Sequence, residues 1–367
     1  MAVRLGIIGY GGIGGFHESY LTAGEIKNCV LTAVCDIDEK QLKKAEVKFG
    51  DKVKRFSDYH DLISSGECDA VIVSTPHYDH PGISIDCLKA GLHVIVEKPA
   101  GVYTKAVLEM NKVAKESGKV FTIMYCMRTD EKYKKIKDLV TSGELGEIKR
   151  VNWIATDWYR PQAYHDSSSW RSSWKTEGGG LIINQCPHNL DILQWIFGMP
   201  EEITAHCEFG KYYNIEVEDD VTVHMHYKNG MNCVFIASTG EAPGTNRLEI
   251  AGSRGQLIVE NGEMIFKRNR VDERVHNANN KVSMAKPEVW ECKVPMVNTA
   301  KIHQRITQNF VNAIEKGEAL IAPGESGINE MEISNAIHMS AWTKQTVKLP
   351  VDPDKFYALL QEKINGK

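Results

Sequence analysis

Three features are missing from this sequence of 367 residues, and each absence excludes a class of protein. No apolar run approaches the roughly 20 residues that a membrane-spanning helix needs, and the glycine-rich start MAVRLGIIGYGG does not resemble a signal peptide. The nine cysteines include no CxxC pair and no regular spacing, which argues against a disulfide framework and against a zinc site. We therefore expect a cytoplasmic protein with no membrane partner and no bound metal.

A strong excess of basic residues is also absent. The sequence has 44 lysines and arginines against 48 aspartates and glutamates, which makes the formal net charge −4. Because nucleic-acid-binding proteins carry a positive excess, we expect no nucleic-acid partner. With 42% hydrophobic and 25% charged residues the composition is that of an ordinary globular protein, and the length allows two domains.

What the sequence does contain is an alternation of strand-like and helix-like segments over its first third. The expected strands are short apolar runs rich in β-branched residues, namely VRLGIIG, VLTAVCD, DAVIVSTP, HVIVEKP and VFTIMYC. Near-continuous apolar strands that alternate with helices indicate a parallel sheet covered on both faces. The pattern predicts a doubly wound α/β domain over residues 1–124.

After residue 128 the pattern changes to an alternation of period two. It is present in IKRVNWIATDW, EEITAHCEF, DDVTVHMHY, MNCVFIAST, RLEIAGS, QLIVEN and EMIFKRN. Asn229-Gly230 and Asn261-Gly262 are typical of two-residue hairpin turns. We predict an α+β domain over residues 125–367 with a large, mostly antiparallel sheet, and late helices in HQRITQNFVNAIEKG and SGINEMEISNAIHMSAWTKQ.

A glycine-rich turn between the first strand and the first helix is typical of a dinucleotide site. Gly9, Gly11 and Gly14 form the pattern GxGxxG, and Asp36 ends the second strand 22 residues after Gly14. The glycines allow backbone N–H groups and the helix N-terminus to approach a pyrophosphate. The Asp36 carboxylate would accept hydrogen bonds from a ribose and repel a 2′-phosphate, and the next two residues supply no arginine. The motif therefore predicts NAD rather than NADP.

Two further stretches carry polar groups where the pattern predicts burial. The strand HVIVEKP ends in Glu97-Lys98-Pro99, and proline cannot continue a central ladder, so the chain must turn and present Lys98 at the carboxyl edge of the sheet. EGGGLIINQCPHNLDILQWIFG, residues 177–198, predicts an apolar helix after a glycine turn, with Asn184, His188 and Asp191 on one face. Taken alone, the lysine could be a solvated charge and the three helix residues could be satisfied core groups.

Together these motifs resemble those of the Gfo/Idh/MocA oxidoreductases. The resemblance rests on GxGxxGxxH from Gly9 to His17, STPHYDH from Ser74 to His80, EKP, and GGG…N…H..D, and it covers almost the whole chain. It implies a Rossmann domain followed by an open-faced sheet used for substrate binding and subunit contacts, and hence a homo-oligomer built through that sheet. It also implies NAD(P)-dependent hydride transfer at a carbinol carbon of a sugar, cyclitol or related polyol.

The resemblance also implies roles for single residues. Lys98 matches the lysine that holds the reacting hydroxyl, and His188 matches the histidine that acts as general acid and base. Asn184 stands where many members carry aspartate. Because an amide cannot take a proton, Asn184 can orient the substrate or His188 but cannot relay protons. The expected relay rests on His188 and Lys98, with Asp191 supporting the helix or the histidine from behind.

The remaining expected contacts follow from the same motifs and from DWYRPQAYHDSSSWRSSWKTEGGG, residues 157–180. That segment is rich in aromatic residues, arginines and hydroxyls, which suits a carbohydrate but would also suit a subunit interface. The expected cofactor contacts are Gly9, Tyr10, Gly11, Gly12, Ile13, Gly14, Asp36, Ser74, Thr75, His80, Glu97, Lys98, Trp170 and Arg171. The expected substrate contacts are Lys98, Arg128, Tyr159, Arg160, Tyr164, Asn184 and His188.

The combination of RPQAY…SSSWR with NQCPHNLD resembles a branch of the family that oxidises the sugar ring of glucosides at C3. In some of these enzymes NAD stays bound and is regenerated by an oxo-sugar. Two other enzymes stay open, an inositol-type polyol dehydrogenase and a glycosidase that uses NAD for redox-assisted elimination. A non-catalytic sugar-sensing regulator is disfavoured by the intact Lys98 and His188.

Overall fold

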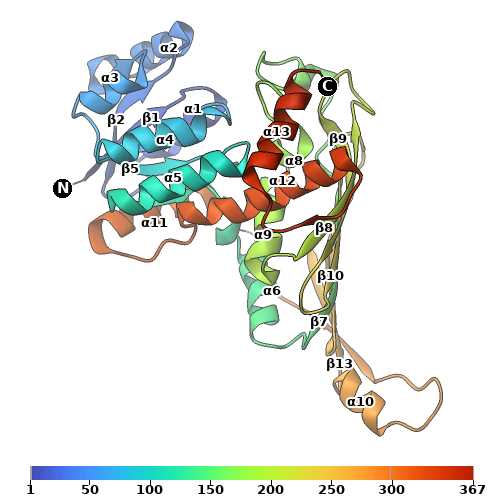
Figure 1. The fold of residues 1–367 in the computed structure, drawn as a ribbon. Coiled ribbons are helices and arrows are strands. Elements are labelled where there is room, and N and C mark those ends of the chain that lie inside the picture. Colours follow the sequence, from blue (N-terminus) through green and yellow to red (C-terminus); the bar gives the residue numbers. More distant parts are fainter. Residues whose placement is uncertain (1, 298, 367) are drawn as a thin grey trace.

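The computed structural model describes residues 2–297 and 299–366. Within these ranges the chain forms two sheets, one of six strands in the order β3-β2-β1-β4-β5-β6 and one of nine in the order β14-β13-β12-β11-β7-β10-β9-β8-β15 (Figure 1). All pairs of the first sheet are parallel. The second sheet is antiparallel except for the pair of β7 and β10. Both sheets confirm the predicted fold class.

The first sheet is a doubly wound sheet whose strand order reverses between β1 and β4, the place where such folds bind ligands. Its strands are β1 (Val3–Ile8), β2 (Cys29–Cys35), β3 (Lys54–Phe56), β4 (Ala70–Val73), β5 (His93–Val96) and β6 (Phe121–Ile123). Its connecting helices are α1 (Gly12–Thr22), α2 (Glu39–Phe49), α3 (Tyr59–Ser64), α4 (Asp79–Lys89) and α5 (Thr104–Ser117). The strands β4 and β5 are apolar and almost fully buried because helices cover both faces.

The second sheet alternates buried and exposed side chains because helices cover one face of it. Its strands are β7 (Ile148–Ala155), β8 (Glu202–Phe209), β9 (Glu218–His226), β10 (Asn232–Ser238), β11 (Asn246–Gly252), β12 (Gly255–Glu260), β13 (Glu263–Asn269), β14 (Val289–Lys293) and β15 (Val347–Lys348). Both predicted hairpins are confirmed. In the β12–β13 turn Asn261 and Gly262 have φ of 51° and 75°, as a type I′ turn requires.

Further helices follow β6 in the described part of the chain. They are α6 (Glu131–Thr141), α7 (Gln162–His165), α8 (Leu181–Asn184), α9 (Pro187–Phe197), α10 (Glu273–Asn279), α11 (Ile302–Lys316), α12 (Gly327–Thr343) and α13 (Pro353–Ile364). α12 packs against α9 and β8 on one side and against α5 on the other. No helix in the described part of the chain is long and apolar enough to cross a membrane.

Helix α11 belongs to the core of the first sheet although it lies near the end of the chain (Figure 1). Ile306, Phe310 and Val311 are fully buried in the same cluster as the strands of that sheet. The hydroxyl of Tyr20 on α1 lies 2.8 Å from that of Thr307 on α11. The domain boundary at residue 124 stays a prediction. The core of the first sheet nevertheless includes side chains of α11, which lies far after that boundary in the sequence.

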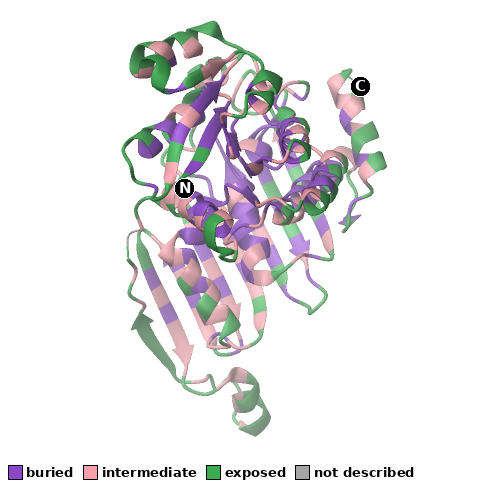
Figure 2. Ribbon diagram, turned by 90° about the vertical axis from the view of Figure 1, so that its left-hand side faces the viewer, coloured by how far each residue is buried: buried purple, intermediate pink, exposed green. Residues whose placement is uncertain are grey.

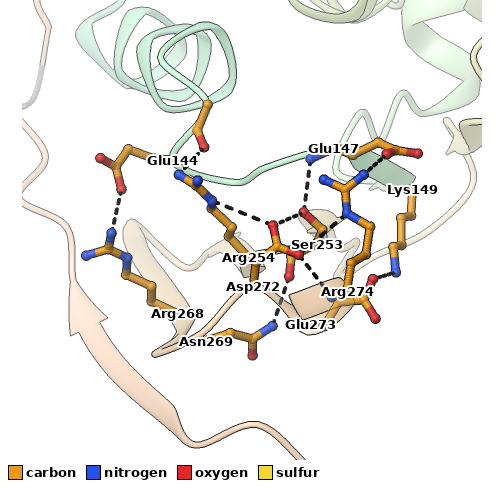
Figure 3. A network of polar contacts seen from close by, with 11 residues as sticks. Glu144, Glu147, Lys149, Ser253, Arg254, Arg268, Asn269, Asp272, Glu273 and Arg274 are labelled. Carbon is orange, nitrogen blue, oxygen red and sulfur yellow. Dashed lines mark hydrogen bonds and ion pairs between the residues drawn. The ribbon is translucent and has the colours of Figure 1, made fainter. Parts of the chain in front are cut away.

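An arm formed by β13, α10 and β14 projects from the end of the second sheet (Figure 1). All five residues of β14 are exposed and α10 buries none of its residues (Figure 2). A network of ion pairs fastens the base of the arm to the turn between α6 and β7 (Figure 3). In it Arg268 lies 3.3 Å from Glu144, and Arg274 pairs with Glu147.

We expect Phe310→Ala to lower the free energy of unfolding by about 3–5 kcal/mol, the usual result of emptying a buried aromatic site. The ring is fully buried against strands more than 180 positions earlier in the chain. Phe209→Ala is the control, because Phe209 is 38% exposed and should lose less than half as much. Denaturant titration measures both values. Equal losses would show that α11 does not stabilise the first core.

Candidate active site

The turn between β1 and α1 is tightly packed on its inner side and open on its outer side. A Cβ on Gly9 would lie 2.7 Å from the carbonyl carbon of Ser74, and one on Gly14 would lie 2.1 Å from the Gly9 oxygen. A Cβ on Gly11 or Gly12 would meet no atom within 4 Å. Gly9 and Gly14 therefore allow close packing. Gly11 and Gly12 leave free space at the N-terminus of α1, where a phosphate is favoured.

Asp36 is fixed beside this turn by two backbone donors. Its carboxylate accepts hydrogen bonds from the N–H groups of Tyr10 at 2.7 Å and Asp38 at 2.8 Å. Each oxygen keeps a lone pair for a ribose hydroxyl. Tyr10 was expected among the cofactor contacts, but its ring is buried and its hydroxyl donates to Glu18 at 3.1 Å. Ile13, in the first turn of α1, is 39% exposed.

The loop after β4 has only one hydroxyl left for a ligand. Ser74 Oγ donates to the Gly9 carbonyl at 2.8 Å, so it braces the glycine turn. Both ring nitrogens of His80 lie 2.8 Å from carbonyl oxygens, those of Pro99 and Thr75. The buried ring of His80 thus joins two loops, and the cofactor contact expected of it stays a prediction. Thr75 Oγ1 is buried without a partner among the described residues, as a group awaiting a ligand would be.

Glu97, which was expected to contact the cofactor, is bonded to a residue of α1. It is buried at the end of β5, and its Oε1 lies 2.7 Å from His17 Nε2. Burial opposes its charge, but the hydrogen bond and charge of His17 outweigh burial and lower the pKa of Glu97 to about 2. The other ring nitrogen of His17 contacts Tyr20. The carboxylate thus joins β5 to α1 inside the protein.

Lys98 and His188 approach each other from different elements. Lys98 Nζ donates to the backbone carbonyl of Asn184 at 2.7 Å, and burial lowers the pKa of its ammonium group. His188 Nδ1 is buried without a partner among the described residues. Burial, followed by the Lys98 charge, lowers the pKa of His188 to about 3, so its imidazole is neutral near pH 7. A cation thus lies near a neutral base, as expected from the motifs.

The predicted single helix over residues 181–198 is instead two helices. α8 ends at Asn184 and α9 begins at Pro187, which has no N–H group to continue the helix and suits a first helical position. Asn184, His188 and Asp191 therefore do not share one continuous face. The Asn184 side chain points to Glu177 and Tyr164, whereas Asp191 points to Arg128.

Arg128, which was expected to contact the substrate, is hydrogen-bonded to other groups of the protein. It lies in η2 (Cys126–Thr129), is 3% exposed and donates to both oxygens of Asp191, at 2.9 and 2.6 Å. It also donates to Ser326 Oγ at 3.1 Å and to the Ile321 carbonyl at 3.4 Å. These bonds use four of its five N–H groups. Asp191 accordingly anchors α9 through Arg128.

The aromatic segment before the glycines gathers around the hydroxyl of Tyr164. That oxygen accepts from Arg171 at 2.6 Å, from Gln185 at 3.1 Å and from Asn184 at 3.3 Å. The Arg171 guanidinium lies 4.5 Å from the ring centres of both Tyr164 and Trp170. Trp170 in turn contacts His77, in the loop after β4, with ring centres 5.3 Å apart.

Trp170 and Arg171 thus lie between the nucleotide-side loop and the Lys98 region. The other two expected substrate residues lie further out. The Arg160 guanidinium covers the Tyr164 ring at 5.2 Å, and Tyr159 is 47% exposed.

Glu177 is a site residue that sequence reasoning missed. It is 3% exposed, and its carboxylate accepts from Asn184 Nδ2 and from the Ser172 N–H. Burial raises the pKa of Glu177 to about 7, although both hydrogen bonds and Arg171 act in the opposite direction. Its position directly before three glycines was a usable signal, because a backbone that turns there brings the carboxyl close to Asn184.

Comparison with known proteins identifies the class. A family model described as the NAD-binding Rossmann fold of an oxidoreductase family matches residues 3–125, and the GFO/IDH/MocA C-terminal domain matches residues 133–258. The chain therefore belongs to the Gfo/Idh/MocA family of oxidoreductases, and its first sheet is the NAD-binding Rossmann domain.

Its relatives include the myo-inositol 2-dehydrogenase of Thermotoga maritima, which is 28% identical over 71% of this chain and 75% of that protein. The scyllo-inositol 2-dehydrogenase (NADP(+)) IolW of Bacillus subtilis is 26% identical over 95% and 96%. Among solved structures, the WlbA dehydrogenase of Chromobacterium violaceum in complex with NADH and UDP-GlcNAcA superposes with a TM-score of 0.81. It is 27% identical and covers 96% of this chain and 97% of that one.

We expect Gly12→Ala to weaken NADH binding by about tenfold or more without destabilising the protein. The added methyl group meets no protein atom and favours the helix, but it fills the space left for the pyrophosphate. Gly82→Ala is the matched control, because Gly82 is also an exposed helical glycine with no neighbour within 4 Å. Calorimetric titration and thermal unfolding measure the two effects. Unchanged affinity in Gly12→Ala would place the cofactor elsewhere.

Proposed function

We propose that this protein is an NAD-dependent dehydrogenase that oxidises a ring hydroxyl of a sugar or glycoside, at C3 of a glucose unit. The observation that carries the proposal is the neutral, unpartnered imidazole of His188 near the Lys98 ammonium, beyond the carboxyl edge of a Rossmann sheet. A hydroxyl held between these groups would have a cation to stabilise its developing negative charge and a base to take its proton.

The chain's residues fit a nicotinamide dinucleotide. The open face of Gly11 and Gly12 and the N-terminus of α1 would hold the pyrophosphate, Asp36 the ribose, and Thr75 a further polar group. When bound, the nicotinamide supplies the hydride chemistry. The protein residues then orient the alcohol: Lys98 binds its oxygen, His188 accepts the proton, and Asn184 donates or accepts a hydrogen bond.

A sugar is supported by the segment around Tyr164, in which aromatic rings alternate with arginine and hydroxyl groups. It is also supported by the solved relative that holds NADH and UDP-GlcNAcA, a nucleotide sugar. A second candidate is an inositol-type polyol dehydrogenase, which is favoured by the two relatives named as inositol dehydrogenases. Both candidates share the chemistry of a secondary ring alcohol.

The preference for NAD rests on Asp36. A 2′-phosphate would add negative charge beside this carboxylate, and the following residues Ile37, Asp38 and Glu39 are apolar or acidic. One relative is named as an NADP(+) enzyme, so the fold alone does not decide the nucleotide.

We expect a screen of sugars, glycosides and cyclitols, with and without added NAD, to give a 3-oxo-glucoside identified by mass and position. With that substrate, Lys98→Ala and His188→Ala should lower kcat/KM by about 10²–10⁴-fold, the usual contribution of a positioned acid or base. NADH affinity should change by less than about threefold, because neither side chain is needed for the pyrophosphate.

Lys89→Ala and His60→Ala are the controls, since both side chains are exposed and lie outside the site. Full activity in Lys98→Ala or in His188→Ala would refute the assignment of roles. Oxidation of inositols alone would favour the second candidate, whereas release of a free aglycone would indicate elimination.

We expect Asp36→Ser to weaken NADH binding by about tenfold and to bring the affinities for NADPH and NADH close together. The change removes an ionised acceptor for ribose hydroxyls, and with it the charge that repels a 2′-phosphate. Asp38→Asn is the control, because it removes a nearby charge while an asparagine can still cap α2. Comparable binding of NADPH and NADH by the unaltered protein in a calorimetric titration would contradict the proposed preference for NAD.

A further inference from the structure

We propose that Glu177 sets which end of the Asn184 amide faces the substrate, and thereby whether the site favours an alcohol or a ketone. Glu177 acts as a positioning residue through Asn184 and does not contact the reacting atoms. The inference rests on the proposed function only in naming the alcohol and the ketone as ligands.

The amide of Asn184 is held by one end. Its Nδ2 donates to Glu177 Oε1 and lies 3.3 Å from the Tyr164 hydroxyl, whereas no described residue donates to its Oδ1. The backbone carbonyl of the same residue accepts from Lys98 Nζ at 2.7 Å. Asn184 therefore does two things at the site: its backbone carbonyl holds Lys98, and its Oδ1 remains a free acceptor.

Glu177 is itself held in a fixed orientation. Its Oε2 accepts from the Ser172 N–H at 2.5 Å, and its backbone carbonyl lies 3.1 Å from the Nδ1 of buried His77. Oε2 accepts from a backbone N–H that cannot turn away, whereas Oε1 accepts from a side-chain amide that can rotate, so a proton that binds to this carboxyl goes to Oε1. Oε1 is the oxygen that faces Asn184.

The pKa of Glu177 lies close to neutral pH. Burial raises its pKa to about 7; the hydrogen bonds from Ser172 and Asn184 and the charge of Arg171, 3.8 Å away, lower it, and Glu218 raises it further. The other titratable groups that face this cluster are Lys98, the neutral His77, and Tyr164.

Each protonation state requires one orientation of the amide. An ionised Glu177 can only accept, so Nδ2 of Asn184 turns to it and Oδ1 faces the substrate, where it can accept from the hydroxyl of a bound alcohol before that hydroxyl turns to His188 and gives up its proton. A protonated Glu177 donates to Oδ1, so Nδ2 faces the substrate, where it can donate to a ketone. The Tyr164 hydroxyl can donate or accept, so it satisfies both orientations. An aspartate at position 184 would instead place two carboxyl groups in contact, which disfavours the ionisation of both.

The test is Glu177→Gln, in which the side-chain amide mimics the protonated carboxyl at every pH. The KM for the alcohol should rise about tenfold, the usual result of losing one hydrogen bond, while kcat and the KM for the ketone change less than about twofold. In the unaltered protein the alcohol KM should rise as the pH falls through about 7. In Glu177→Gln it should not depend on pH in this range.

A charge exchange provides the rescue. In the double variant Glu177→Gln with Asn184→Asp, the new carboxylate accepts from the amide introduced at position 177 and again offers an acceptor to the alcohol, so the alcohol KM should return toward its original value. Glu216→Gln is the matched control, because Glu216 is an exposed glutamate of the same region whose side chain has no hydrogen bond to a described residue. A pH dependence that persists unchanged in Glu177→Gln, or a double variant no better than Glu177→Gln, overturns the proposal.

A second measurement does not depend on turnover. With ¹⁵N-labelled asparagine, the side-chain resonance of Asn184, identified by its loss in Asn184→Ala, should shift with a midpoint near pH 7. The shift should be absent in Glu177→Gln. A resonance that does not shift in the unaltered protein overturns the role of Glu177. If no sugar or polyol is oxidised at all, the proposed function fails, and this measurement still decides the role of Glu177.

Discussion

The guanidinium of Arg128, buried just after the last strand of the Rossmann sheet, binds groups from two later parts of the chain. It forms a bidentate ion pair with Asp191 on α9. It also donates to Ser326 Oγ and to the carbonyl of Ile321, both near the start of α12. Breaking a buried pair by removing one partner costs about 3–5 kcal/mol, because an uncompensated charge is left behind. Since α9 carries His188, this pair also fixes the imidazole relative to the sheet that positions Lys98.

Most polar groups around the site are already hydrogen-bonded to other parts of the protein, and only a few in the described part of the chain are left without a partner. Ser74 and His80 brace the loops at the carboxyl edge of the sheet, and Glu97 is paired with His17. With these groups bonded, Thr75 Oγ1 and the imidazole of His188 are left unpartnered among the described residues. A buried polar atom without a partner costs free energy, and a bound ligand can supply the missing hydrogen bond.

Burial sets the chemistry of the site as much as residue type does. It keeps His188 neutral near Lys98, and it raises the pKa of Glu177 to about 7. An exposed glutamate would be ionised at that pH. Asn184 cannot titrate, yet its orientation depends on a neighbour that does.

The sequence by itself determined the features that depend on local patterns. Hydrophobic periodicity specifies the alternating strands and helices, Asn-Gly turns specify the hairpins, and GxGxxG specifies an open turn before α1, because each depends on neighbouring residues alone. Only the tertiary structure decided that α11 joins the first core, that Arg128 binds Asp191, and that Glu177 reaches Asn184. These outcomes depend on which donor and acceptor meet when separate elements pack, and the periodicity of a segment carries no information about its distant partner.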